Sequence, residues 1–306
     1  MDEFAGKLAV VTGGGSGMGR ELVRQLASQG CSVAACDWNA AAVADTVAMA
    51  QAGARDGVRV SSHVCDVSDE AQVQRFRDEL LREHAADHVD LVFSNAGIGG
   101  GASFITSSRE EWERTFAVDW WGTYHCARTF LPLLIASGDG VLVNTSSVNG
   151  FWASLGPRMP NSAYATAKFA VKGFTEGLIE DLRTNAPQVR VALVMPGHVG
   201  TDIVANTRRA HGTAEPEDTN AARIETAFRE RARLTAAAAA TIILDGVRSG
   251  AWRILVGEDA KALDAAVRAR PEVAYDYAKL AMRAAKTAVE DRARSWVATV
   301  RSLFPS

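Results

Sequence analysis

Residues 12–19 read Thr-Gly-Gly-Gly-Ser-Gly-Met-Gly, and this stretch decides the fold. It directly follows the apolar run Leu8–Val11 and opens a helical pattern over Gly17–Gln29, which Gly30 ends. Glycines let such a turn be tight and let its backbone approach a pyrophosphate, which then lies at the N-terminus of the helix. The stretch therefore predicts a strand–turn–helix unit that binds a dinucleotide, although a glycine run alone is often a plain turn.

Outward from this turn, apolar runs alternate with amphipathic helical patterns through the first 200 residues. The runs are apolar along their whole length, which is typical of a parallel sheet covered by helices on both faces. Right-handed crossovers between such strands predict a doubly wound α/β fold. The expected strands are Leu8–Val11, Ser32–Cys36, Val58–Cys65, Val89–Ser94, Val141–Thr145, Val189–Met195 and Arg253–Val256. The expected helices are Gly17–Gln29, Ala40–Gly53, Glu70–His84, Arg109–Leu134 and Tyr164–Thr184.

The pattern changes after Pro196. A polar stretch, Thr201–Glu217, is predicted to be mobile, and a helix is expected over Asp218–Ser249. Within one domain that spans residues 1–306, we expect residues 203–235 to form a mobile substrate-binding segment.

The end of the chain is expected to be a helical C-terminal extension over residues 258–306, broken at Pro271. An apolar stripe at helical spacing, which includes Val273, Tyr277 and Leu280, supports this expectation. The extension is interpreted as a cap on the site, a contact with a neighbouring subunit or a determinant of assembly, with ordinary packing on the core left open.

Composition narrows the class of protein. Of the 306 residues, 47% are hydrophobic and 23% are charged, which suffices for a full core and excludes disorder for most of the chain. Lys and Arg number 33 against 36 Asp and Glu, so the net charge of −3 gives no general attraction to nucleic acid or to an anionic membrane. No uncharged apolar run is long enough to cross a bilayer.

The N-terminus and the cysteines favour a cytoplasmic protein. Residues 1–4 are acidic and lack the basic and apolar regions of a signal peptide. Cys31, Cys36, Cys65 and Cys126 show no Cys-x-x-Cys spacing, and we interpret them as reduced core residues. A disulfide or a metal site is the less favoured interpretation, so no metal is expected.

Tyr164 and Lys168 are four residues apart on an expected helix, so their side chains share one face. A lysine ammonium near a tyrosine hydroxyl lowers the tyrosine pKa from about 10 toward neutrality. Such a tyrosine transfers a proton to or from a carbonyl or alcohol oxygen. This spacing alone is frequent, however, and usually marks a solvated helix face.

Small and polar residues follow several expected strands, at the sheet edge where open α/β sheets bind ligands. They are Asp37, Asn95-Ala96-Gly97, Ser146-Ser147 and Pro196–Thr201. Asp37 comes 18 residues after Gly19, where a carboxylate reaches the ribose hydroxyls, or alternatively caps the next helix. A serine hydroxyl at this edge orients a substrate oxygen, or alternatively serves as a cap or turn residue.

In this order, the motifs resemble the short-chain dehydrogenase/reductase family over about residues 6–202 and the last strand. Both the Thr-Gly-x-x-x-Gly-x-Gly and the Tyr-x-x-x-Lys patterns are present, and the glycine spacing is similar to that of the short, single-domain branch. The resemblance implies a Rossmann-type doubly wound parallel sheet of about seven strands with helices on both faces. It also implies an NAD(P)-dependent oxidoreductase that interconverts a secondary alcohol and its ketone (EC 1.1.1.-).

The resemblance implies a role at each matching position. Tyr164 would be the acid/base, Lys168 would lower its pKa and hold the nicotinamide ribose, and Ser147 would orient the substrate oxygen. The implied cofactor-binding residues are Gly13, Ser16, Gly17, Met18, Gly19, Asp37, Asp66, Val67, Asn95, Ala96, Gly97, Tyr164, Lys168, Pro196, Gly197, Val199 and Thr201.

The sequence departs from the family at its fourth catalytic position. The family usually has asparagine in a Val-Asn-x-x-Gly setting, where this chain has Asp119. In the family that residue helps hold a water of the proton relay, largely through its backbone carbonyl. We expect Asp119 to be a catalytic residue, whose carboxylate could also raise the pKa of Lys168 or alter the relay.

Asp37 favours NAD(H) over NADP(H), because a carboxylate bonds both ribose hydroxyls and repels a 2′-phosphate. No Arg or Lys lies within residues 12–19 or immediately after Asp37, where a basic residue would favour NADP. The expected substrate is a small hydrophobic alcohol or ketone, since the candidate pocket is apolar and aromatic. The candidate pocket residues are Phe151, Trp152, Leu155, His198 and Ile203, and residues 151–162 form an unusually long loop.

Two alternatives stay open. Arg158, Arg208 and Arg209 could read an acyl carrier or a carboxylate, as in a β-ketoacyl or polyketide-type ketoreductase. A non-catalytic NAD(H)-sensing regulator would need the glycines but not the tyrosine. The resemblance also implies a homodimer or homotetramer formed through the helices Arg109–Leu134 and Tyr164–Thr184.

Overall fold

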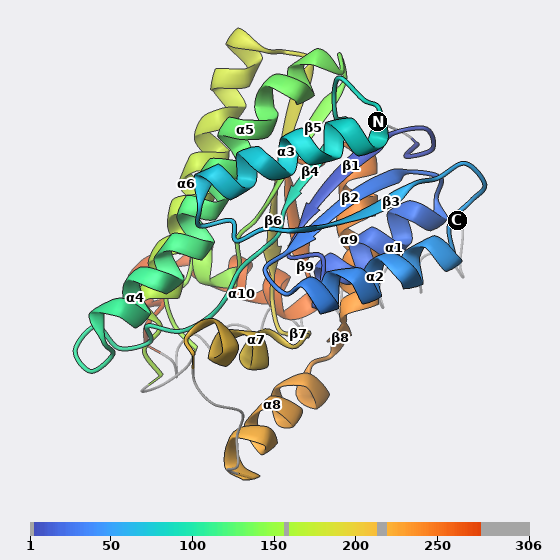
Figure 1. The fold of residues 1–306 in the computed structure, drawn as a ribbon. Coiled ribbons are helices and arrows are strands. Elements are labelled where there is room, and N and C mark those ends of the chain that lie inside the picture. Colours follow the sequence, from blue (N-terminus) through green and yellow to red (C-terminus); the bar gives the residue numbers. More distant parts are fainter. Residues whose placement is uncertain (1–2, 156–158, 213–218, 277–306) are drawn as a thin grey trace, which may run out of the picture.

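The computed structural model describes residues 3–155, 159–212 and 219–276. It has the predicted doubly wound parallel sheet, with seven strands in the order β3-β2-β1-β4-β5-β6-β9 and helices on both faces (Figure 1). The strands are β1 (Leu8–Thr12), β2 (Ser32–Asp37), β3 (Val60–Val64), β4 (Leu91–Ser94), β5 (Gly140–Thr145), β6 (Val189–Pro196) and β9 (Arg253–Val256). A separate pair joins β7 (Val199–Gly200) to β8 (Leu234–Thr235).

Ten α-helices lie within the described residues. They are α1 (Gly17–Ser28), α2 (Ala40–Ala52), α3 (Glu70–His84), α4 (Arg109–Phe116), α5 (Gly122–Ala136), α6 (Ser162–Asn185), α7 (Ile203–Ala210), α8 (Thr219–Arg231), α9 (Ala236–Arg248) and α10 (Glu258–Ala269). Buried side chains of α1, α2 and α9 pack on one face of the sheet, and those of α3, α5 and α6 pack on the other.

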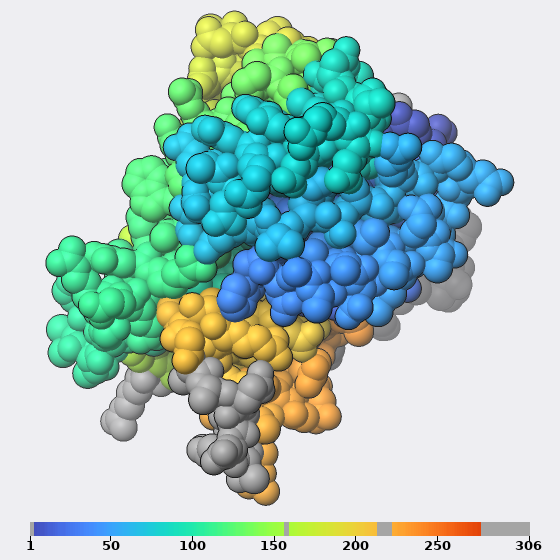
Figure 2. Space-filling view, in the orientation of Figure 1, coloured from blue at the N-terminus to red at the C-terminus, as the bar shows by residue number. Residues whose placement is uncertain are grey.

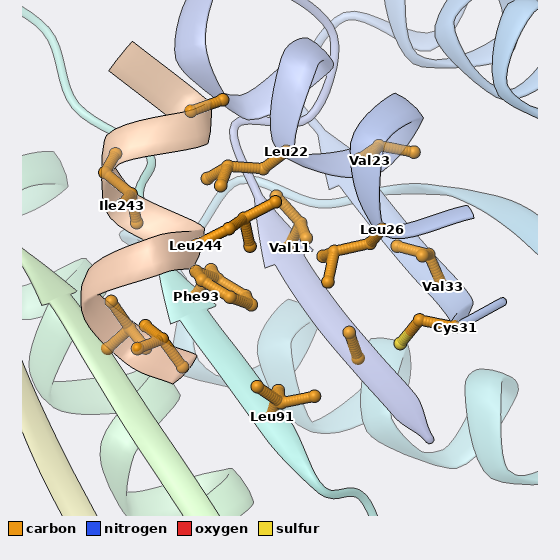
Figure 3. Close-up of a cluster of buried hydrophobic side chains, with 14 of the residues drawn as sticks. Val11, Leu22, Val23, Leu26, Cys31, Val33, Leu91, Phe93, Ile243 and Leu244 are labelled. Atoms are coloured by element: carbon orange, nitrogen blue, oxygen red, sulfur yellow. The ribbon is translucent and has the colours of Figure 1, made fainter. Parts of the chain in front are cut away.

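Strand β1 shows why the strands are apolar throughout. Val11 belongs to the core cluster under α1 and α9, where Leu22, Phe93 and Leu244 surround it (Figure 3). The preceding residue, Val10, belongs to the cluster on the opposite face. Successive side chains of a strand point to opposite faces, so a strand that is covered on both sides, as β1 is, has apolar residues on both.

Two helix predictions were wrong in their continuity. The expected helix Arg109–Leu134 is divided into α4 and α5 by a π-helical turn over Ala117–Trp121. The expected helix Asp218–Ser249 is interrupted at β8, because Thr235 accepts a hydrogen bond from the Ala238 N–H at 3.2 Å and starts a new helix.

The polar stretch that was expected to be mobile contains helix α7. Residues 213–218, which complete that stretch, lie outside the described residues. Of the expected C-terminal extension, α10 and a short 3-10 turn over Pro271–Val273 are described, while residues 277–306 lie outside the described part. In the ranges that the structure does describe, no helix is long and apolar enough to span a bilayer.

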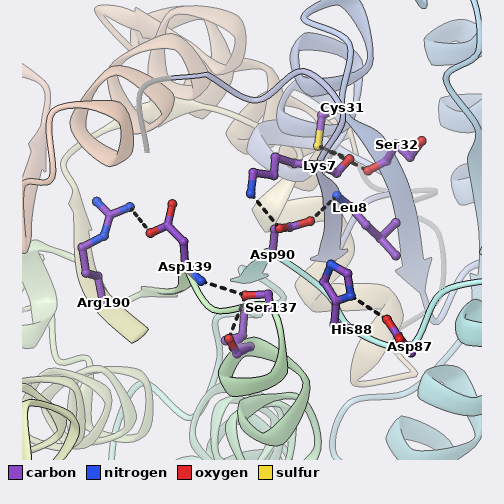
Figure 4. A network of polar contacts seen from close by, with 11 residues as sticks. Lys7, Leu8, Cys31, Ser32, Asp87, His88, Asp90, Ser137, Asp139 and Arg190 are labelled. Carbon is purple, nitrogen blue, oxygen red and sulfur yellow. Dashed lines mark hydrogen bonds and ion pairs between the residues drawn. The ribbon is translucent and has the colours of Figure 1, made fainter. Parts of the chain in front are cut away.

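At the amino-terminal ends of the strands, Asp90 ties β1 to β4 (Figure 4). One of its oxygens accepts a hydrogen bond from the Leu8 N–H at 2.8 Å, and the other accepts one from Lys7 Nζ at 3.0 Å. Asp90 is only 4% exposed, so the Leu8 N–H has no ready replacement by water. This end of the sheet is therefore held by polar contacts, which leaves the opposite end for a ligand site.

We predict that Asp90→Ala lowers the free energy of unfolding by about 2 kcal/mol, because a buried N–H loses its acceptor. Urea-induced unfolding monitored by tryptophan fluorescence measures the change. The matched control is Asp87→Ala, which removes the exposed partner of His88 on the same loop and should leave the midpoint unchanged. Equal midpoints for the two variants would contradict this role for Asp90.

Candidate active site

A cleft opens at the carboxyl ends of the strands, where the strand order reverses between β1 and β4. Such a reversal is where doubly wound sheets bind their ligands. Helix α7 borders the cleft, and Figure 2 shows its gold surface lying against the blue N-terminal part of the chain. The lining residues are Gly13, Ser16, Gly17, Met18, Asp37, Trp38, Cys65, Asp66, Val67, Asn95, Ala96, Gly97, Ile98, Arg114, Val118, Thr201, Ile203, Asn206 and Ala210.

The glycine turn at the base of the cleft leaves no room for side chains. A Cβ atom at Gly19 would lie 2.0 Å from the Gly13 carbonyl oxygen, and one at Gly13 would lie 2.8 Å from Ala96 Cα. The first turn of α1 contains no acidic residue, and Ser16 makes no side-chain cap bond there. The backbone N–H groups of this turn thus fit the pyrophosphate of a dinucleotide.

Asp37 lies at the end of β2 and faces the glycine turn. Its two carboxylate oxygens accept hydrogen bonds from the N–H groups of Gly15 and Asn39, both at 3.0 Å. Burial raises the pKa of Asp37. These hydrogen bonds and the charge of the nearby Arg20 guanidinium lower the pKa, but they offset only part of the rise. Asn39, and not Asp37, caps α2, so the alternative of a capping role for Asp37 is excluded.

Asp66 and Asn95 lie at the ends of the neighbouring strands. Burial raises the pKa of Asp66, but hydrogen bonds from Ser68 and Arg114 outweigh it and hold that pKa below its usual value. Asn95 donates from Nδ2 to the Thr12 carbonyl oxygen at 3.1 Å, which joins the ends of β4 and β1. Asn95 Oδ1 is buried with no hydrogen-bond partner in the described structure. A buried polar atom of this kind at the edge of a cleft is available to accept a hydrogen bond from a ligand.

Sequence reasoning named Asn206 and Ala210 only as part of the expected substrate-binding segment 203–235. It missed five further lining residues, which are Trp38, Cys65, Ile98, Arg114 and Val118. Arg114 on α4 pairs with Asp66 at 2.7 Å, Asn206 on α7 donates to Ser16 Oγ at 2.8 Å, and Trp38 follows Asp37. No spacing in the sequence links Arg114 to Asp66 or Asn206 to Ser16, because the two residues of each pair are far apart in the chain and meet only in the folded structure.

The four predicted catalytic residues lie close together beside Gly97. The Ser147 hydroxyl is near enough to Tyr164 to lower the pKa of its phenol, and Lys168 Nζ lies 5.5 Å from the centre of the Tyr164 ring. Asp119 Oδ1 lies 2.7 Å from Lys168 Nζ. A Cβ at Gly97 would lie 2.6 Å from Asp119 Oδ1, so this group adjoins the wall of the cleft.

The two serines of the pair have different contacts. Ser146 donates its hydroxyl to the Lys168 carbonyl oxygen at 2.7 Å, which fixes β5 to α6. Ser147 accepts from the Asn149 N–H at 3.1 Å and contacts Tyr164. Of the two, Ser147 therefore has the geometry to share a substrate oxygen with the tyrosine.

The pKa of Tyr164 differs from the sequence-based expectation. Burial raises it, the positive charge of Lys168 lowers it as expected, and the negative charge of Asp119 raises it again. The net direction is upward, so the expected shift toward neutrality is wrong for this chain. For Lys168, burial lowers the pKa, but Asp119 outweighs it and raises that pKa above the usual value, as the departure at position 119 suggested.

The predicted substrate pocket is only partly assembled. Ile203 lines the cleft, whereas Phe151 and Trp152 pack on the C-terminal extension and Leu155 is 53% exposed. His198 does not line the cleft, and its Nε2 lies within hydrogen-bonding distance of the Phe228 carbonyl oxygen on α8, at 2.7 Å.

The C-terminal extension reaches the loops beside the site. Trp152 donates its indole N–H to the Ala274 carbonyl oxygen at 2.8 Å, and the Ala153 N–H donates to Tyr275 Oη at 3.1 Å. At the start of α10, Asp259 Oδ2 accepts from the His198 N–H at 2.7 Å, next to the predicted cofactor residues Pro196, Gly197 and Val199.

The four cysteines are core residues, as the sequence interpretation expects. Cys31, Cys36, Cys65 and Cys126 are buried thiols without a disulfide. Across the described ranges, no group of three or more His, Cys, Asp or Glu side chains is arranged to hold a metal ion.

The short chain dehydrogenase family model matches residues 7–212, and the chain belongs to this family. Its members are oxidoreductases that bind NAD or NADP.

Relatives in sequence and structure agree with this assignment. SadH of Mycobacterium tuberculosis is 38% identical over 268 residues, which cover 88% of this chain and 92% of SadH. A short-chain dehydrogenase/reductase of Burkholderia phymatum, solved in complex with NAD, is 34% identical with a TM-score of 0.77 and covers 89% of this chain and 95% of its own. A metagenomic short-chain oxidoreductase in complex with NADP is 30% identical with a TM-score of 0.56, covering 70% and 94%.

We predict that Gly19→Ala weakens NADH binding at least ~10-fold, because the new methyl group would collide with the Gly13 carbonyl oxygen. Quenching of tryptophan fluorescence on NADH titration measures the Kd. Gly53→Ala is the matched control, since its new Cβ atom would meet nothing closer than 3.9 Å. This variant should bind NADH as the wild-type protein does. An unchanged Kd in a folded Gly19→Ala variant would argue against this turn as the dinucleotide site.

Proposed function

We propose that this chain is an NAD(H)-dependent dehydrogenase that interconverts a hydrophobic secondary alcohol and its ketone. The observation that carries the proposal is the grouping of Ser147, Tyr164 and Lys168 beside Gly97, which itself lines the cleft whose base fits a dinucleotide. A dinucleotide sensor would need the cleft alone, so the presence of this grouping favours an enzyme.

The side chains have distinct roles in this proposal. The bound nicotinamide supplies or accepts the hydride at the substrate carbon. Tyr164 gives the proton to the substrate oxygen or takes it, while Ser147 hydrogen-bonds the same oxygen. The ammonium group of Lys168 directs two of its N–H groups to Asp119 and to the Thr145 carbonyl oxygen. Its third N–H is the one that holds the nicotinamide ribose.

The preference for NAD(H) rests on Asp37. Its carboxylate lines the cleft where the adenine ribose of a dinucleotide would lie, and a 2′-phosphate there would meet a negative charge. Arg20 is nearby, but its guanidinium donates to the Gly15 carbonyl oxygen and to Thr46 Oγ1. The arginine therefore supports the glycine turn and the middle of α2 instead of a phosphate site.

The charge around the cleft favours an uncharged substrate over an acyl carrier. Arg208, one of the three arginines that could read an acyl carrier, forms an ion pair with Glu225. Its charge is therefore already compensated. Arg158, another of those arginines, lies outside the described residues. A relative in mouse, 33% identical over 199 residues, is named (3R)-3-hydroxyacyl-CoA dehydrogenase, and this keeps a β-ketoacyl substrate as the second candidate.

Helices α5 and α6 are the proposed interface of a homodimer or homotetramer. Trp121 and Phe169 are 45% and 41% exposed, and Trp120, Tyr124 and Phe174 form one aromatic cluster between the two helices. The buried thiols fit a reducing compartment, so the proposed location is the cytoplasm.

We predict that Tyr164→Phe lowers turnover at least ~10²-fold, because the proton donor is lost. NADH binding should persist, since the glycine turn and Asp37 are untouched. Steady-state rates with a panel of hydrophobic alcohols and ketones measure the effect, and Tyr124→Phe serves as the matched control with normal turnover. Wild-type turnover in Tyr164→Phe would refute the proposed acid/base.

We predict that Asp37→Ala combined with Trp38→Arg reverses the cofactor preference toward NADPH, because the repulsive carboxylate is exchanged for a guanidinium. The ratio of the Kd values for NADH and NADPH is the measurement, and a shift of at least ~10-fold is expected. Asp45→Ala, an exposed substitution on α2, should leave the ratio unchanged. A wild-type preference for NADPH would refute the role given to Asp37.

A further inference from the structure

Asp119 and Lys168 form a buried ion pair where the family pattern has an asparagine and a lysine. Their side chains are 0% and 3% exposed. We propose that Asp119 is a positioning residue that offsets part of the charge of Lys168 and so helps to hold the buried Tyr164 in its phenol form at neutral pH, which sets this site for reduction of a carbonyl. The inference rests on the proposed function, because it takes Tyr164 as the acid/base.

The contacts of Lys168 define how much of its charge reaches the tyrosine. Its ammonium group lies 2.7 Å from Asp119 Oδ1 and donates to the Thr145 carbonyl oxygen at 3.1 Å. It lies 5.5 Å from the centre of the Tyr164 ring, which is about twice its distance from the carboxylate. Tyr164 therefore experiences the field of a close dipole and not that of a single cation.

The neutrality of this pair does not depend on which partner holds the proton. Burial raises the pKa of Asp119, and the charge of Lys168 with its hydrogen bond counteracts part of that rise. If the proton moved from Lys168 to Asp119, both groups would be uncharged and their sum would still be zero. An asparagine at position 119 would instead leave the lysine charge uncompensated beside Tyr164.

The carboxylate of Asp119 is fixed in place by the fold. Asp119 lies in the π-helical turn between α4 and α5, and its Oδ2 accepts a long hydrogen bond from the Ile98 N–H at 3.4 Å. Its Oδ1 occupies the space that a side chain at Gly97 would take. The absence of a side chain at position 97 thus makes room for the pair.

No other described charge compensates the pair at Tyr164. On α4, Glu111 accepts from the Gly101 N–H at 2.8 Å and Arg114 pairs with Asp66. His211, after α7, contacts the Gly99 carbonyl oxygen, and Arg190 on β6 pairs with Asp139. Within the described residues, burial is the largest influence against the phenolate of Tyr164. Of the two charges that act on it, Lys168 favours the phenolate and Asp119 offsets part of that effect.

The protonation state of Tyr164 decides which direction of the reaction it serves. In reduction, the Tyr164 O–H bond breaks and its proton goes to the carbonyl oxygen, while the carbonyl carbon accepts the hydride with its two electrons from bound NADH. The resulting tyrosinate regains a proton from solvent. Oxidation of an alcohol requires the tyrosinate at the outset, so a neutral pair at positions 119 and 168 disfavours oxidation at neutral pH.

The first test is the pH profile of alcohol oxidation in Asp119→Asn. Removal of the negative charge stabilises the tyrosinate, so the acidic limb of kcat/KM should move to lower pH and relative activity at pH 7 should rise at least ~3-fold. Glu176→Gln is the matched control, because it removes the carboxylate of a partly exposed ion pair with Lys172 on α6, the helix that also carries Lys168. A limb that stays in place, or moves to higher pH, overturns the proposal.

The second test needs neither turnover nor a folded Asp119 variant. Ultraviolet absorbance of tyrosinate is recorded against pH for the wild-type protein and for Tyr164→Phe, and their difference isolates Tyr164. No tyrosinate from Tyr164 is expected up to pH ~9, since its pKa lies above the ordinary value of about 10. A signal near neutrality overturns the inference, whereas absence of turnover with every alcohol and ketone would overturn the proposed function alone.

Discussion

The site depends on one steric constraint, the contact between the end of β1 and the start of α1. The Gly13 carbonyl oxygen occupies the space of a side chain at position 19, and Ala96, just after the end of β4, occupies the space of one at position 13. Because three backbone segments meet there without intervening side chains, the N–H groups of α1 stay open to the cleft. The same approach brings the Gly15 N–H within reach of Asp37 on β2, so the carboxylate is oriented by the turn itself.

Most of the sheet could be predicted from the sequence, because burial on both faces makes central strands such as β1 apolar along nearly their whole length. The interrupted helices could not be predicted in the same way. The run of alanines after Thr235 favours a helix at every position, and the helix start is placed there by the pairing of β8 with β7 together with the cap at Thr235. Likewise, the π-helical turn at Asp119 leaves the helical pattern of the sequence uninterrupted, and its extra residue becomes evident only in the backbone.

The candidate site divides along a similar line. Residues within one motif, such as Tyr164 and Lys168, come together because helical spacing fixes their distance. Contacts between motifs depend on how α4, α6 and α7 approach the sheet, so the pairing of Arg114 with Asp66 has no local signal. The same holds for the sign of the Tyr164 pKa shift, which depends on Asp119 from another element and on burial, neither of which the Tyr-x-x-x-Lys spacing encodes.

The described part of the C-terminal extension shares its polar contacts with the loop after β5. The indole N–H of Trp152 ends on the Ala274 carbonyl oxygen, and α10 is itself held to β9 by the ion pair of Asp264 with Arg253. Loop and extension are therefore one module for protein engineering. If the loop after β5 were replaced by the loop of a relative that lacks the extension, the hydrogen bond between loop and extension and the apolar packing between them would be lost together. Substrate scope is therefore best altered by exchanging the loop and the extension at once.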